Sequence, residues 1–320
     1  SVENLTKTAC DIMLSSGFES LSMNSLSTGD YPHLKELLAS LKSNLPSNTT
    51  VSLPSLRIDS FEEYYAQEAK KNSLTFAPEA GTQRLRDVIN KDITEQEIKN
   101  GVEKAFNLGY SAIKLYFMLG LPTEIDEDLE GICDIVEMIK SVYSQNDKRL
   151  RGLRINVSVS TFIPKPFTPF QWEAQDTLEE LAKKQEHLGS KITDRKIRYT
   201  YHDAKVSRIE AVLARGDRRI GKVIETAWRK GCNLDSWDEH FKFDVWMESF
   251  AECGVEPEFY ANRTRSYDEV MPWDIFDYAV TKKFIINENK KAHESVTTPN
   301  CRLKCSGCGA NCLKGGACFE

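Results

Sequence analysis

The sequence predicts an α/β protein whose parallel strands form a barrel or a partial barrel. Residues 113–119 are almost continuously apolar, which is typical of a strand buried on both faces in a parallel sheet. The run leads into a Gly-Leu-Pro-Thr-Glu turn at 120–124 and then into an acidic helix. Five strand–helix units of this kind follow one another within residues 1–192, near the ~30 residues typical of a βαβ unit. Because the loops with chemical character follow strand ends, they would share one face of a barrel.

Each unit pairs a short apolar strand with an amphipathic helix. A helix with Leu5, Ala9 and Met13 at helical spacing precedes the first strand and ends at Gly17. The predicted strands are residues 18–24, 51–58, 73–77, 111–119 and 153–162. Each strand is followed by a predicted helical segment. The first contains Leu34–Leu41, the second spans 61–70, the third consists of helices that run through 108, and the last two span 126–143 and 178–192. We therefore expect the parallel core to occupy residues 1–200.

Helical patterns replace strands beyond residue 201. Amphipathic helices are predicted at 205–215, 218–230 and 236–253. Aromatic residues recur at roughly helical intervals in the last of these, and we interpret them as core packing: Trp237, Phe241, Trp246 and Phe250. Residues 201–296 would thus be mainly helical. The tail at 297–320 is rich in Gly and Cys and poor in apolar residues, so it would need a metal or cluster to fold.

Composition limits the classes of function. At 320 residues and 40% hydrophobic content, the chain can bury one large core and a small second domain. The net charge of −6 gives no general attraction to nucleic acid or anionic membrane. No apolar run approaches the ~20 residues of a membrane span, and residues 1–17 lack a signal-peptide pattern. Nine cysteines, five of them within 301–318, suit metal or cluster ligation in a reducing, cytoplasmic compartment without a membrane partner.

The loop after the third strand carries two charged candidates. Glu79 ends the strand and Arg84 falls in the first turn of the next helix, so both would project over the barrel mouth. A carboxylate there can accept from the two hydroxyls of a ribose, and an arginine can bind a carboxylate through two parallel hydrogen bonds. The alternative is a surface ion pair at a helix N-terminus.

The fourth strand presents two candidate catalytic side chains, Lys114 and Tyr116. Because side chains alternate along a strand, Lys114 and Tyr116 would share one face with Met118. The other face would carry Ile113, Leu115, Phe117 and Leu119. A lysine facing the barrel interior needs a partner or a function, because a bare buried ammonium is costly. The fifth strand ends in a loop with three prolines at 164, 166 and 169, whose free carbonyls would suit an adenine edge or merely stop the strand.

The segments 25–31, 78–84, 120–124 and 162–169, in this order and spacing, resemble the second to sixth strands of a radical S-adenosylmethionine (SAM) enzyme. The likeness covers nearly the whole chain. It is closest to methylthiotransferase-like and cobalamin-binding radical SAM proteins. The runs 26–31, 157–166 and 213–219 resemble an uncharacterised family among these with an upstream B12-binding-type domain.

The resemblance implies a SAM site built from these loops. It would place the methionine amine near Ser25 and Ser27, the ribose near Glu79, and the carboxylate near Arg84. It would place the adenine against the backbone between Phe162 and Pro164. Ser55 and Arg57 would line the same cavity. The implied cofactors are SAM, a [4Fe–4S] cluster and cobalamin bound through the upstream domain. An electron donor such as ferredoxin or flavodoxin would be a partner, and the unknown substrate would be RNA or a small molecule.

One departure from the family pattern concerns the cluster loop. The CxxxCxxC motif of that family follows the first barrel strand, and no such cysteines precede the helix that begins here at Ser1. Without those thiolates there is no SAM cluster and no radical chemistry. We therefore expect the chain to be a C-terminal portion that lacks the first strand and is inactive alone.

The tail carries a second cysteine motif. Cys301, Cys305 and Cys308 spell CxxxCxxC, and Cys312 and Cys318 follow. Four thiolates within 301–312 predict a closed site for a structural zinc or an auxiliary [4Fe–4S] cluster, and the spacing does not separate the two. We expect this site to be distinct from the SAM cluster, and Cys318 to be a spare ligand.

Two other classes of function remain open at this point. The chain could be a zinc-stabilised interaction scaffold on a barrel fold, or a (βα)-barrel lyase that uses Lys114 as a Schiff-base amine. A basic stretch, His202 to Arg219, could bind a phosphorylated substrate or RNA, but it also contains Glu210 and Asp217, and a solvated helix face is the preferred interpretation.

Overall fold

The computed structural model describes residues 1–25, 28, 31–52, 73–146, 152–301 and 303–313. Its strands are β1 Ser20–Ser22, β2 Thr50–Ser52, β3 Leu74–Glu79, β4 Ala112–Leu119, β5 Arg154–Thr161 and β6 Ile197–Tyr201. Its α-helices are α1 Val2–Ser16, α2 Leu34–Asn44, α4 Gln83–Val88, α5 Glu95–Asn107, α6 Asp126–Ser144, α7 Leu178–Lys191, α8 Ala204–Arg215, α9 Arg218–Arg229, α10 Phe243–Glu252, α11 Pro257–Ala261 and α12 Lys282–His293. Short 3₁₀ helices are η2 Pro169–Trp172 and η3 Ala310–Leu313.

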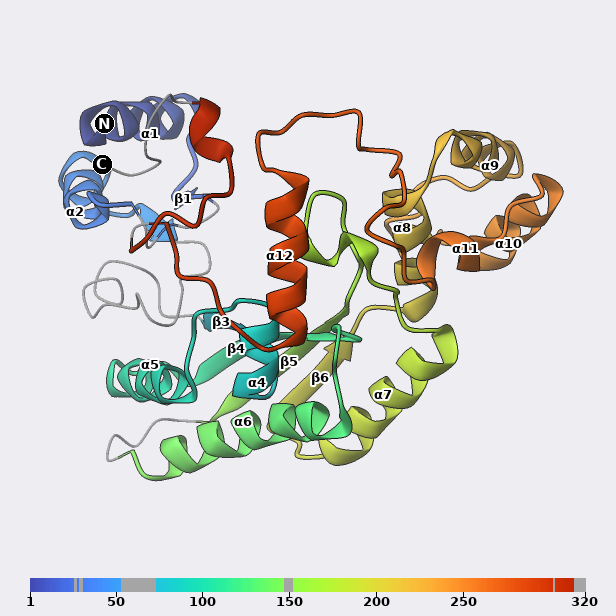
Figure 1. Ribbon diagram of the computed structural model, residues 1–320. Coiled ribbons are helices and arrows are strands. Elements are labelled where there is room, and N and C mark those ends of the chain that lie inside the picture. Colours follow the sequence, from blue (N-terminus) through green and yellow to red (C-terminus); the bar gives the residue numbers. More distant parts are fainter. Residues whose placement is uncertain (26–27, 29–30, 53–72, 147–151, 302, 314–320) are drawn as a thin grey trace.

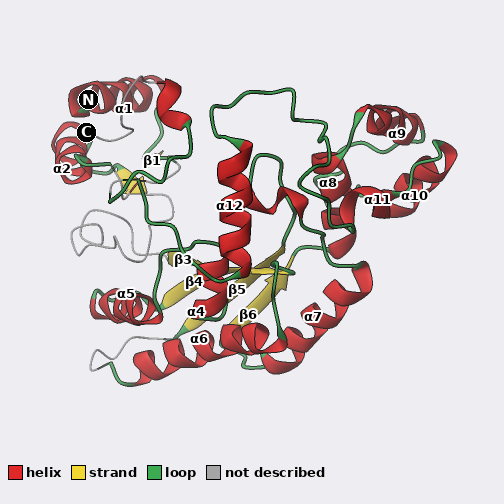
Figure 2. Ribbon diagram, in the orientation of Figure 1, coloured by secondary structure: helices red, strands yellow, loops and turns green. Residues whose placement is uncertain are grey.

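The described strands form two parallel sheets. β1 pairs with β2, and the second sheet has the order β3-β4-β5-β6, with every pairing parallel. This confirms the α/β class with a partial (βα)-type core (Figure 2). The prediction of five strands missed β6, whose side chains are half-buried or exposed. An edge strand of this kind has no continuous apolar run to reveal it.

One face of the larger sheet carries the main core. Burial alternates along β4, with Ile113, Leu115, Phe117 and Leu119 buried and the residues between them half-buried, as predicted. Helices α5, α6 and α7 cover this face, while α12 lies on the other side, beside α4 (Figure 1). The site must therefore lie on the polar face or at the C-terminal edge of the sheet, apart from the part that α12 covers.

Local sequence signals set the helix ends. Thr94 and Glu97 form a capping box at the start of α5, and Thr177 and Glu180 do the same for α7. Gly17 adopts a φ of 70° where α1 ends, as predicted from its position. These ends fix where each crossover returns to the sheet.

The region after β6 is helical, with one correction. Helices α8 to α11 share an apolar core that includes Trp246 and Phe250. The helix predicted over 236–253 begins only at Phe243, and Trp237 lies in a turn with 61% of its surface exposed. Aromatic spacing alone misled the prediction, because the turn at 233–242 happens to keep a roughly helical interval.

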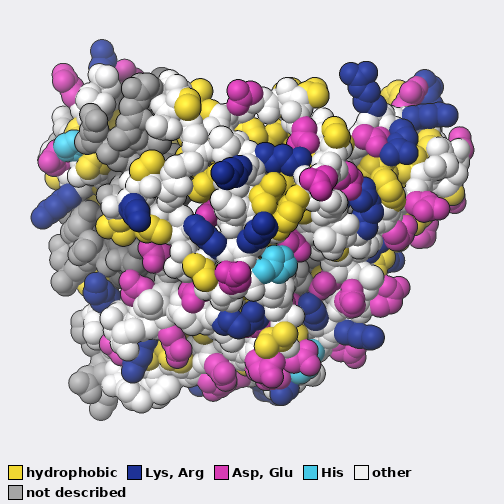
Figure 3. Space-filling model, in the orientation of Figure 1, with side chains coloured by type: hydrophobic (Ala, Val, Ile, Leu, Met, Phe, Trp, Pro, Cys, Tyr) yellow, Lys and Arg dark blue, Asp and Glu magenta, His cyan; other side chains and the backbone are white. Residues whose placement is uncertain are grey.

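Some predictions fall outside the described residues. They are the helix at 61–70 and the remainder of the strand at 51–58. Within the described chain, no helix is both long and apolar enough to cross a membrane. The face shown in Figure 3 gathers Lys and Arg side chains over α12, interspersed with acidic ones, which is typical of a solvated helix face.

Candidate functional site at the carboxyl ends of the strands

The end of β3 is irregular at Glu79. The β3–β4 register shifts between Phe76 and Glu79, and Glu79 adopts a φ of 68°, in the left-handed region. Its carboxylate oxygen Oε1 lies 3.3 Å from Nζ of Lys91. Glu79 is half-buried, and Oε2 has no partner among the described residues, so one carboxylate oxygen remains to accept from a ligand.

Glycine lets the loop after β3 pack directly on α6. A Cβ at Gly81 would lie 2.2 Å from the carbonyl oxygen of Asp128, and one at Gly131 would lie 2.8 Å from the backbone of Gly81. Only two glycines permit this approach. The contact sets the position of α4 and therefore of the Arg84 side chain in its first turn.

Arg84 joins the β3 and β4 loops. Its Nη2 donates to the carbonyl of Thr123 at 2.9 Å and pairs with the buried carboxylate of Asp128, while Nη1 donates to Oγ1 of Thr123 at 3.1 Å. Asp128 in turn accepts from the backbone N–H of Ile125 at 2.9 Å. Nε and one Nη1 hydrogen have no partner in the described part of the chain. These two donors are what a ligand carboxylate would use.

The turn after β4 contains a buried ion pair that sequence reasoning missed. Glu124, whose side chain is 2% exposed, accepts from Nζ of Lys184 at 2.7 Å and from the backbone N–H of Gly120 at 3.0 Å. Lys184 also pairs with Asp176 at 2.7 Å. Burial raises the pKa of Glu124, although Lys184 and the Gly120 N–H oppose the rise. Burial lowers the pKa of Lys184, but the carboxylates of Glu124 and Asp176 raise it, and the net pKa is raised.

The end of β5 is covered. Phe162 and Pro164 are both buried, and the carbonyl of Phe162 accepts from Nε2 of Gln175 at 3.2 Å. The Phe162 ring meets Phe170 edge to face and belongs to one apolar cluster with Ala292 of α12. Helix α12 therefore closes this part of the edge, and no local sequence pattern indicates that it does so.

The other predicted residues lie apart from these loops or outside the described residues. Nζ of Lys114 lies 4.6 Å from the centre of the Tyr116 ring, a cation–π contact on the polar face of the sheet. Ser25 exchanges a 2.6 Å hydrogen bond with Thr28. Ser27, Ser55 and Arg57 lie outside the described residues.

The segment from α12 into the tail is tied to the site. Glu173 accepts from Nδ2 of Asn289 at 2.8 Å and lies 2.7 Å from Nε2 of His293. Beyond the helix, Asn90 and Thr298 exchange two hydrogen bonds. The tail thus leaves α12 beside the loop that carries Lys91, the partner of Glu79.

The predicted metal ligands do not converge. Cys301, Cys305 and Cys312 are exposed and Cys308 is half-buried. No group of three or more His, Cys, Asp or Glu side chains among the described residues is arranged to hold a metal ion. The described tail shows no preformed metal site, and the metal site at these cysteines remains a prediction. Cys318 lies outside the described residues.

Comparison with known proteins places a family over the first part of the chain. Residues 13–136 match the model of the radical SAM superfamily. An uncharacterized protein of Methanocaldococcus jannaschii, MJ0966, is 32% identical over 229 residues, which is 72% of this chain and 48% of that protein. The chain thus spans about half the length of this relative. Residues 13–136 carry a radical SAM superfamily domain.

Proposed function

We propose that this chain is the C-terminal portion of a radical SAM enzyme and that it binds SAM at the carboxyl ends of β3 to β5. The observation that carries the proposal is the superfamily match over 13–136. It is supported by the geometry of that segment, whose parallel strands end in Glu79, in the Thr123 turn and in Phe162 at one edge. An enzyme, rather than a scaffold, is what this match favours.

Two side chains would hold the cofactor directly. Glu79 would use its free Oε2 for the ribose hydroxyls, and Arg84 its free Nε and Nη1 hydrogens for the carboxylate. The ties of Arg84 to Thr123 and Asp128 orient the guanidinium before a ligand arrives, which lowers the entropy cost of binding. When bound beside a reduced [4Fe–4S] cluster, SAM supplies a radical for substrate modification.

The adenine side of the site depends on α12. Phe162 and Pro164 would present backbone acceptors to the base, yet Phe162 already accepts from Gln175 and packs near Ala292. The Ser25–Ser27 segment, Ser55 and Arg57 would complete the cavity. Lys114 and Tyr116, on the polar face of β4, are the proposed catalytic side chains.

The remaining cofactors belong to the proposal as well. The SAM cluster would take its thiolates from upstream of this chain, and cobalamin would bind an upstream domain. The tail cysteines would hold zinc or an auxiliary cluster. Ferredoxin or flavodoxin would supply electrons, and the substrate would be RNA or a small molecule handled in the cytoplasm.

The lyase alternative has less support. The superfamily match over 13–136 includes Lys114 and favours a radical SAM reaction over a Schiff base at this lysine.

Equilibrium dialysis with labelled SAM tests the proposal. Glu79→Gln keeps the shape of the side chain but removes its charge, and loss of a charged hydrogen bond of about 1.5–3 kcal/mol weakens affinity roughly tenfold to hundredfold. Glu127→Gln, an exposed glutamate in the first turn of α6, is the matched control and should leave the Kd unchanged. Equal SAM affinity in wild type and Glu79→Gln would remove Glu79 from the site.

A further inference from the structure

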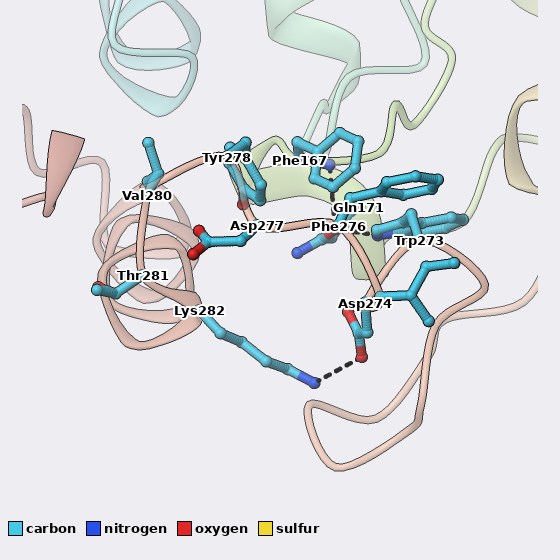
Figure 4. A pocket seen from close by; sticks show the side chains of 11 residues that line it. Phe167, Gln171, Trp273, Asp274, Phe276, Asp277, Tyr278, Val280, Thr281 and Lys282 are labelled. Atoms are coloured by element: carbon cyan, nitrogen blue, oxygen red, sulfur yellow. Dashed lines mark hydrogen bonds and ion pairs between the residues drawn. The ribbon is translucent and has the colours of Figure 1, made fainter. Parts of the chain in front are cut away.

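A hollow outside the strand-end site lies between the β5–α7 loop and the segment that leads into α12. It encloses about 420 Å³. Its walls come from two chain segments, Phe167 with Gln171 on one side and residues 273–278 with 280–282 on the other. Figure 4 shows these side chains around the hollow. None of the SAM-binding residues proposed above lines it.

Gln171 offers this hollow a hydrogen-bond donor of fixed orientation. The side chain is 4% exposed, and its Oε1 accepts from the backbone N–H of Phe167 at 3.2 Å and from Nε1 of Trp273 at 2.6 Å. With both donors on Oε1, the amide group cannot flip, so Nε2 must face the hollow. Figure 4 shows that nitrogen pointing into it. Nε2 has no partner among the described residues, so it is open to donate to a ligand acceptor in the hollow.

Asp274 adds an acceptor at the same hollow. Its Oδ2 accepts from the backbone N–H of Met271 at 3.0 Å and lies 3.4 Å from Nζ of Lys282. Oδ1 has no partner in the described part of the chain. Asp274 and Gln171 thus present one acceptor and one donor, with Asp277 adding a second carboxylate to the lining.

Aromatic rings complete the lining. Phe276 is 62% exposed, Trp273 is held by its hydrogen bond to Gln171, and the rings of Phe167 and Tyr278 lie 4.3 Å apart. Phe167 adopts a φ of 63°, an unfavourable conformation for a bulky residue. An exposed ring beside a polar edge is how proteins stack a base and read its edge.

We propose that this hollow binds a nucleobase. Every nucleobase has a donor next to an acceptor on its edge, which Oδ1 of Asp274 and Nε2 of Gln171 complement, while its face would stack on Phe276. Two aspartates against one lysine disfavour a phosphate here, so the base and not the phosphate supplies the affinity. The base can come from a free nucleoside or from single-stranded RNA.

Calorimetric titration with the four nucleosides tests the proposal on the whole chain. A short single-stranded RNA serves as the second arm, and tighter binding of RNA than of any nucleoside identifies RNA as the source. Phe276→Ala should weaken binding about tenfold or more, the typical effect of losing one base–aromatic stack. Trp228→Ala is the matched control, because Trp228 is also 62% exposed but lies on α9. It should leave affinity unchanged.

Gln171→Glu should change the base preference of the hollow, which would not change if Gln171 only supported the fold. The new carboxylate still accepts from Phe167 and Trp273, but it replaces the inward donor with an acceptor. Beside Asp274, two acceptors match the paired donors N1–H and N2–H of guanine. Adenosine, cytidine and uridine should therefore weaken roughly tenfold while guanosine weakens least.

Three results would overturn the proposal. The first is no binding of any nucleoside or of the RNA to the wild-type chain. The second is an equal loss for all four bases in Gln171→Glu. The third combines two observations: SAM completely displaces a bound nucleoside, and Phe276→Ala leaves the nucleoside affinity unchanged. Together they would assign the binding to the strand-end site. Because the assay measures binding without turnover, it can succeed even where the radical SAM proposal fails.

Discussion

Asn90 and Thr298 bind each other through two hydrogen bonds, although 208 residues separate them in sequence. Nδ2 of Asn90 donates to the carbonyl of Thr298 at 3.1 Å, and the backbone N–H of Thr298 donates to Oδ1 of Asn90 at 2.8 Å. Asn90 has a φ of 52°, a conformation that Asn adopts more readily than most residues. The pair anchors the start of the cysteine tail to the loop after α4.

Replacing Asn90 with Gly should release the tail. Glycine keeps the left-handed backbone without strain, so the substitution removes only the side-chain bonds. We expect faster proteolysis after about residue 297 with little change in the melting temperature of the core. Asn48→Gly, which removes an exposed bond to Glu19, is the control. Unchanged cleavage in the Asn90 variant would mean that other contacts hold the tail.

The tail cysteines are predicted to bind one zinc ion or one four-iron cluster per chain. The tail has few apolar side chains, so the free energy of metal binding would be its folding energy. Cys305→Ser combined with Cys308→Ser should abolish the bound metal, measured by elemental and sulfide analysis after anaerobic purification. Residues from about 297 should become protease-sensitive while the parallel core persists. Cys10→Ser, on α1, should retain full metal content, and full retention in the double variant would refute the site.

Gly81 should tolerate no side chain. A Cβ there would lie 2.2 Å from a backbone oxygen of α6, which cannot move without shifting the helix. We expect Gly81→Ala to destabilise the fold by about 2–3 kcal/mol, in the range of overpacked sites. Gly221→Ala is the contrast, since a Cβ there meets nothing within 4 Å on exposed α9, and it should stabilise by about 0.5–1 kcal/mol. Urea unfolding measures both, and equal effects would contradict the packing argument.

Asp217 gives stability that depends on pH. Hydrogen bonds from Arg219 lower its pKa from 3.8 to about 2, and Tyr260 adds a further bond. A carboxyl group whose pKa is lower in the folded state stabilises it above the unfolded pKa, and that contribution is lost as pH falls through the folded pKa. The window is therefore from about pH 4 down to about pH 2. Allowing for partial exposure, the contribution at pH 7 is about 1–2 kcal/mol.

Asp217→Asn isolates this contribution. Asn still caps α9, because its Oδ1 can accept from the backbone N–H of Arg219. The variant should be less stable than wild type at pH 7 by that amount, and the gap should close between pH 4 and 2. Urea midpoints at several pH values measure it. A gap that does not change with pH would show that the charge of Asp217 is not the cause.

The sequence predicted the features that have local signals. Alternation along β4, the apolar stripes of α5 and α6, and the Gly17 helix end each depend on residues a few positions apart. It also predicted that Glu79 ends a strand and that Arg84 lies in the first turn of the next helix, as in β3 and α4. Such signals are sufficient for the fold class because burial follows the period of each element.

The missed features depend on distant residues. Lys184 reaches Glu124 across 60 positions, and Ala292 packs in the cluster of Phe162 only because α12 folds back over the sheet edge. Nothing near Gln171 in sequence shows that Trp273 will fix its amide. The predictions for the short edge strand β6 and for the turn around Trp237 were wrong for the opposite reason. Their local sequence patterns are weak or misleading.

The tail is anchored at both ends of α12, which constrains how its length can vary. Thr298 accepts from Lys291 near the end of the helix, and the carbonyl of Cys308 accepts from the backbone N–H of Thr281 at its start. The twelve residues of α12 span about 18 Å, a distance that six extended residues can cover. The ten positions from 298 to 308 therefore leave slack of about four residues. Deletions within that slack should keep both anchors, longer ones should break one, and insertions should accumulate there without disturbing the sheet.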